Sequence, residues 1–283
     1  MLMKKIHMNR KKSKFSIVLY LVLLTPAFCL AKVVTTYSLD SPITKTIEEW
    51  ADQDTIVFIG LDDVLFTPEA SMFRYNSPYR NFIQELIANL GKMPANKQLV
   101  ETWYSQRKLR LVEAGWPEFI EHLQAKGARV YGLCAIPIYI KDMDKKILEE
   151  VRVLGINFTD EINKNKMVKI FEQDGWQSVF YNGILFSGPL SKAKAIVDFM
   201  KTSKLAPKKV VVFDNAKYII KQIDKSLKVF DMDFYNIEYL AASQQASSID
   251  PKIVRLQQEQ LILNNKWLED DQAKSMVELN PGK

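Results

Sequence analysis

The stretch from Thr55 to Phe66, TIVFIGLDDVLF, constrains the fold of this chain more than any other part of it. It begins with five apolar or β-branched residues and continues through Gly60 into two carboxylates, Asp62 and Asp63. A short apolar run that ends in acidic residues is typical of a buried parallel strand whose carboxyl end opens into a site. Because ligands of open α/β sheets bind beyond the carboxyl ends of the strands, we expect functional residues here.

Residues 1–31 have the pattern of a secretory signal peptide. They start with a segment that holds six Lys/Arg and no acid, continue with an apolar run from Ser16 to Phe28, and end at the small residue Ala31. The run is shorter than the roughly 20 residues that a spanning helix needs, so no stable membrane span is expected after cleavage. An uncleaved anchor is the alternative interpretation. We therefore expect an exported protein, periplasmic or secreted.

Cleavage after Ala31 would also remove the positive net charge of the chain. The chain carries +6, and all of that excess lies in the leader, so residues 32–283 hold 33 basic and 33 acidic residues. This balance gives no reason to expect a nucleic-acid partner. One cysteine, Cys134, remains after cleavage, which excludes an internal disulfide. One histidine, His122, remains as well, which is too few for a zinc site of the usual kind.

Strand and helix patterns alternate along residues 32–283, which indicates an α/β fold with one doubly wound parallel sheet. Strand patterns occur at residues 55–59, 129–134, 209–215 and, as an edge strand, 229–239. The dipeptide Asn182-Gly183, between alternating apolar residues, predicts a β-hairpin over 178–186. Residues 32–40 are expected to form an extended arm.

Helical spacing of apolar residues predicts most of the remaining elements. Between the first two core strands, residues 68–115 form an insertion in which Phe82, Trp103, Leu109 and Leu111 belong to two or three predicted helices. Other helices are predicted at residues 42–52, 117–126, 144–153, 166–173, 191–201, 218–227 and in a polar tail that begins at residue 251.

Polar residues follow in a fixed order at four predicted strand ends or helix starts: Gly60-Leu61-Asp62, Cys134, Lys192 in SKAKAI, and Asp214-Asn215. This series resembles the four motifs of the haloacid dehalogenase superfamily of phosphohydrolases. The first motif of that superfamily is four apolar residues followed by D-x-D-x-[TV]-[LV]. Asp62 takes its second Asp, and Gly60 stands at the place of the first Asp, the nucleophile. Cys134 stands where the second motif has Ser or Thr.

The resemblance implies a two-step phosphoryl transfer in which one carboxylate attacks phosphorus and another, two residues on, handles the leaving-group proton. It gives Asp62 the acid/base role and assigns phosphate binding to Cys134 and Lys192, with Lys194 as the competing lysine. It assigns Mg²⁺ binding to the backbone carbonyl of Asp62 and to Asp214. A solvated lysine on a helix face is the alternative for Lys192.

Two replacements make this site degenerate. Gly60 cannot act as a nucleophile and removes one carboxylate from the metal site, so Mg²⁺ binding is expected to be weak or lost. We expect an open pocket where the side chain is missing. The alternative is a strand end whose sequence has diverged and that binds no ligand. Cys134 is a weaker donor than a hydroxyl. A cysteine nucleophile would need an Arg at position 140, where the chain has Ile140, so a buried structural thiol is preferred.

The resemblance covers nearly all of residues 32–283 and implies that the insertion, at about residues 68–115, is a small helical cap over the site. A helical layer without a gating role is the alternative. Through its tail from Gln257 to Ala273, the chain is similar to a branch of exported bacterial proteins with a domain of unknown function.

Two functions remain open from the sequence. One is a secreted pseudoenzyme that binds a phosphorylated small molecule or a partner protein, such as a host protein. The other is a Mg²⁺-dependent phosphatase that hydrolyses phosphomonoesters, with water activated by Asp62 or Asp63.

Overall fold

A computed structural model describes residues 31–89, 93, 95–136, 142–162, 165–246 and 248–279. The strands are β1 (Ala31–Thr36), β2 (Thr55–Gly60), β3 (Phe66–Pro68), β4 (Leu109–Leu111), β5 (Arg129–Cys134), β6 (Val168–Gln173), β7 (Trp176–Tyr181), β8 (Ile184–Phe186), β9 (Lys209–Asp214) and β10 (Asp233–Tyr239). The α-helices of the described residues are α1 (Pro42–Trp50), α2 (Phe82–Ala88), α3 (Ala95–Gln106), α4 (Trp116–Ala125), α5 (Met143–Val153), α6 (Lys192–Thr202), α7 (Lys217–Leu227), α8 (Pro251–Asn264) and α9 (Asp270–Leu279). Two short 3₁₀-helices are η1 (Ser71–Phe73) and η2 (Ala241–Gln244).

The main sheet has eight strands in the order β1-β10-β9-β2-β5-β8-β7-β6. The strands from β1 to β8 in this order pair in parallel, whereas β7 pairs antiparallel with β8 and β6. The fold is therefore α/β with a mostly parallel central sheet. The predicted doubly wound sheet needs one correction, because a β-meander extends one side of it antiparallel.

Strand β2 lies at the centre of the sheet, and all six of its residues are buried. Its side chains alternate between two apolar clusters. Val57 and Ile59 pack on the face that α1, α4 and α5 cover, and Ile56 and Phe58 pack on the face that α6 and α7 cover. Fully burying a side chain of this size contributes about 1.5–3 kcal/mol. Burial on both faces explains why β2 is apolar without alternation.

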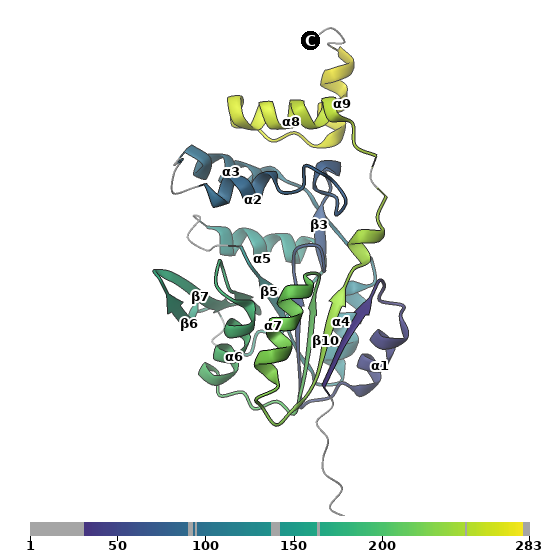
Figure 1. The fold of residues 1–283 in the computed structure, drawn as a ribbon, viewed down its shortest axis with the longest axis vertical. Coiled ribbons are helices and arrows are strands. Elements are labelled where there is room, and N and C mark those ends of the chain that lie inside the picture. The colour runs from purple at the N-terminus through teal and green to yellow at the C-terminus, as the bar shows by residue number, and fades with distance from the viewer. Residues whose placement is uncertain are drawn as a thin grey trace, which may run out of the picture.

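The insertion between β2 and β5 contains more than helices. Strands β3 and β4 form a separate antiparallel pair, so Leu109 and Leu111, which were expected in a helix, belong to a strand. The helices α8 and α9 lie beyond α2 and α3, at the end of the molecule away from the sheet (Figure 1). Trp103 in α3 and Trp267 after α8 share one apolar cluster with Val57 of the central strand. The insertion and the segment after α8 are thus packed into the same apolar cluster as the central strand.

Two further predictions differ from the structure. Residues 166–173 are not a helix, because β6 occupies most of them. Strand β10 is not an edge strand, because β1, the expected extended arm, pairs with it and forms that edge. The expected signal peptide lies outside the described residues except for Ala31, where β1 begins. Within the described part of the chain, no helix is long and apolar enough to span a bilayer.

Candidate functional site

The sheet topology brings the predicted site residues to one edge. Because β2 lies between β9 and β5, the carboxyl ends of these three strands are neighbours. They place Gly60, Cys134 and Asp214 side by side. Lys192 is the first residue of α6, and Ser191 caps this helix by accepting a hydrogen bond from an amide of its first turn. The four positions that resemble superfamily motifs therefore form one cluster.

Lys192 and Asp214 form a buried ion pair. The Lys192 Nζ lies 2.7 Å from the Asp214 Oδ2, and the two side chains are 13% and 1% exposed. The second oxygen, Oδ1, accepts a hydrogen bond of 2.9 Å from the amide of Ala216. Burial lowers the pKa of Lys192, but Asp214 and then Asp62 favour its charged form, and the net pKa lies above its ordinary value. The two charges therefore pair with each other inside the protein.

Gly60 faces this ion pair. A Cβ atom at position 60 would lie 3.2 Å from the carbonyl oxygen of Phe213, 3.2 Å from Cγ2 of Val64 and 3.4 Å from Oδ2 of Asp214. The two contacts of 3.2 Å are tighter than ordinary packing, so a side chain would require these neighbours to shift by a few tenths of an ångström. The expected open pocket at the nucleophile position is therefore wrong for the first atom of such a side chain, because backbone and side-chain atoms already surround it.

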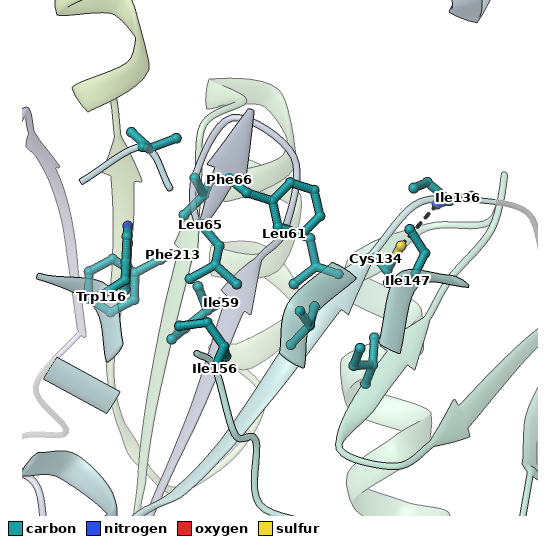
Figure 2. Close-up of a cluster of buried hydrophobic side chains, with 14 of the residues drawn as sticks. Ile59, Leu61, Leu65, Phe66, Trp116, Cys134, Ile136, Ile147, Ile156 and Phe213 are labelled. Atoms are coloured by element: carbon teal, nitrogen blue, oxygen red, sulfur yellow. Dashed lines mark hydrogen bonds between the residues drawn. The ribbon is translucent and has the colours of Figure 1, made fainter. Parts of the chain in front are cut away.

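Cys134 has the surroundings of a packed thiol. Figure 2 shows it at the end of β5, beside the carboxyl end of β2, among apolar side chains that include Leu61 and Ile147. It is fully buried, and its Sγ accepts a hydrogen bond of 3.4 Å from the amide of Ile136. Burial raises the pKa of this thiol, and the charge of Asp62 adds to the effect. The sulfur therefore stays protonated at neutral pH, the unreactive form of a cysteine.

The two carboxylates after β2 have different environments. Asp62 is exposed, and its carboxylate has no hydrogen bond or ion pair with any described residue. Asp63 has a left-handed backbone with φ of 57°. It pairs with Arg80 at 2.6 Å and accepts a hydrogen bond of 3.2 Å from Thr67 Oγ1. Burial raises the pKa of Asp63, and Arg80 opposes this effect. Only Asp62 is thus free to interact with a ligand or with water.

Arg107, the residue that follows α3, is a charged neighbour of the site that sequence reasoning missed. Its Nε and Nη2 donate hydrogen bonds of 3.0 and 2.7 Å to the carboxylate of Glu150 in α5, and both side chains are buried. Its guanidinium stacks over the rings of Trp103 and Tyr104, 4.7 and 4.4 Å from their centroids. Burial lowers the pKa of Arg107, but Glu150 and, more weakly, Tyr104 and Asp62 favour its charged form, and the net pKa lies above its ordinary value. The signal in the sequence was the spacing W-Y-x-x-R on a predicted helix.

The residues do not fit the Mg²⁺ site that the resemblance implies. Among the residues that the structure describes, no group of three or more His, Cys, Asp or Glu side chains could hold a metal ion. A metal ion at Asp214 would share a carboxylate whose two oxygens already accept hydrogen bonds from Lys192 and from the amide of Ala216, and the positive charge of Lys192 would oppose it.

Comparison with known proteins identifies the family to which the chain belongs. The model of the family "Protein of unknown function (DUF2608)" matches residues 37–274. The chain belongs to this family. It is 31% identical over 251 residues to an uncharacterized protein of Rickettsia prowazekii (strain Madrid E), covering 87% of this chain and 92% of the relative.

A second relative of this DUF2608 protein comes from Chlamydia trachomatis serovar D and is named "Putative outer membrane protein". It is 23% identical over 223 residues, which are 75% of this chain and 82% of the relative. An uncharacterized protein of Rickettsia bellii is 22% identical over 218 residues, which are 71% and 72% of the two chains. No solved structure matches the chain.

Proposed function

We propose that this protein is an exported, haloacid dehalogenase-like pseudoenzyme that acts by binding a ligand or a partner protein and does not hydrolyse phosphate esters. The observation that carries this proposal is the ion pair between Lys192 and Asp214, which lies directly beside Gly60. In an active site of this type, the lysine charge would serve the phosphate and the carboxylate would serve the metal. Here each neutralises the other.

The missing nucleophile also argues against hydrolysis of phosphate esters. Neither Gly60 nor the buried, protonated Cys134 can form a covalent phospho-enzyme, and loss of a nucleophile lowers kcat by several powers of ten. Export is supported by the signal-like pattern of residues 1–31 and by the name of the Chlamydia relative.

A Mg²⁺-dependent phosphatase is the second candidate, because the exposed carboxylate of Asp62 is free to activate water. Hydrolysis of an aryl phosphate with Mg²⁺ separates the two functions. We expect no turnover by the wild type or by Gly60→Ala, which controls for the tight packing at position 60. Gain of turnover in Gly60→Asp would support a scaffold that lost its nucleophile. Wild-type turnover that disappears in Asp62→Asn would overturn the proposal.

A further inference from the structure

Two arginines share one amide oxygen where the insertion meets the segment between β10 and α8. Arg74 follows η1, Arg110 lies in β4, and Gln245 follows η2. The Arg74 Nη1 donates a hydrogen bond of 3.3 Å to Oε1 of Gln245, and the Arg110 Nη2 donates to the same oxygen. We call these three residues the junction cluster. It contains none of the residues of the candidate site.

The charge of the junction cluster is not balanced. Within the described ranges, no carboxylate lies within 4.0 Å of either guanidinium, whereas Arg80 and Arg107 each have a carboxylate partner. The other hydrogen bond of Arg74, 3.2 Å long, goes to the backbone carbonyl of Glu69. The Arg110 Nε is buried and has no hydrogen-bond partner. A buried donor without a partner lowers the stability of a protein by about 1–3 kcal/mol, so an acceptor supplied by a ligand would be stabilising at this atom.

A neutral amide oxygen is a weak acceptor for two guanidinium groups. Hydrogen bonds between guanidinium groups and phosphate or carboxylate are roughly twice as strong as neutral ones and are often bidentate. We propose that Arg74 and Arg110 bind a phosphate-type oxyanion, whose place the Gln245 side chain takes in the free protein. A tetrahedral dianion offers acceptors to both arginines and to the Arg110 Nε. Gln245 would then keep only its 3.0 Å bond to the carbonyl of Val112.

Calorimetric titration of inorganic phosphate into the purified protein tests this site. Arg74→Gln and Arg110→Gln should each lower the affinity at least about tenfold, because each removes a charged donor. Gln245→Glu should lower the affinity most, because its carboxylate would pair with both arginines and cancel one of their two positive charges. Arg255→Gln is the matched control, since Arg255 is 81% exposed and pairs with Glu259 on the surface of α8. This control should bind phosphate as the wild type does.

Four results would overturn the proposal. These are the absence of phosphate binding by the wild type, unchanged affinity in Gln245→Glu, an equal loss of affinity in Arg255→Gln, and acetate binding as tightly as phosphate. The Gln245→Glu variant still tests phosphate binding at the junction cluster if the arginine variants fail to fold. This test is independent of the proposed function, because it measures binding at the junction cluster and not hydrolysis at the candidate site.

Discussion

The ion pair between Lys192 and Asp214 predicts a large loss of stability when only one partner is removed. In Lys192→Met, the Asp214 side chain, which is 1% exposed, would retain a single hydrogen bond, from the amide of Ala216. Leaving one charge of a buried pair without its partner costs about 3–5 kcal/mol. Because Lys192 is itself 13% exposed, we expect the lower end of this range, a loss of about 3 kcal/mol.

Two other variants test whether this loss of stability comes from the unpaired buried charge. The double variant Lys192→Met/Asp214→Asn leaves no buried charge and should cost about 1 kcal/mol or less, since replacing a whole buried pair is often nearly neutral. Lys194→Met is the matched control on the same helix. Lys194 is 49% exposed and pairs with Asp198 four residues on, so its loss should cost about 0.5 kcal/mol.

Equilibrium unfolding in urea, followed by circular dichroism, measures all three free energies of unfolding. Equal losses in Lys192→Met and Lys194→Met would refute the reasoning, because Lys192 would then be unpaired in solution and its charge free for phosphate. The pH dependence gives a second check. Since the folded pKa of Lys192 is raised, its contribution is complete below 10.5, its ordinary value, and is lost as pH rises through the folded pKa. The double variant should lack this alkaline loss.

Three other predictions follow. Burial raises the pKa of Glu269 above 4.5, so its stabilising contribution is complete below that pH and is lost as pH rises through the folded pKa. Glu269→Gln should therefore raise the urea midpoint at pH 7 relative to wild type, and a lower midpoint would contradict this. Arg107→Met should cost about 3–5 kcal/mol in the same assay, and Arg107→Met/Glu150→Leu much less; additive losses would argue against the buried pair. Cys134 should react with a thiol reagent only when urea unfolds the protein, and rapid labelling of the native chain, absent in Cys134→Ala, would show that the sulfur is accessible.

The sequence predicted best those elements whose pattern is set by their own burial or turn geometry. Strands β2 and β9 are buried on both faces, and both are continuous apolar runs. The predicted hairpin is present because Asn182 and Gly183 take the positive φ values, 44° and 83°, that its turn requires.

The errors arose where a tertiary contact broke or hid the pattern. Strand β6 was assigned to a helix because a register shift between Lys169 and Phe171 disrupts its alternation. Strand β4 has three residues, too few to show any period. Strand β10 was expected at the edge because no pattern within a strand reveals that β1 will pair with it. The positions of the candidate site were predictable, since parallel strands share a carboxyl edge, but the pairing of Lys192 with Asp214 depends on side-chain geometry.

Lys192 and the junction cluster differ in how their positive charge is balanced. The ammonium of Lys192 already has a carboxylate at 2.7 Å, and an oxyanion would approach it against the charge of Asp214. Arg74 and Arg110 share only a neutral amide oxygen among the described residues. Coulomb attraction for an incoming dianion is therefore stronger at the junction cluster than at Lys192. Substituting Gly60 by Asp would add another carboxylate beside Lys192 and would widen this difference further.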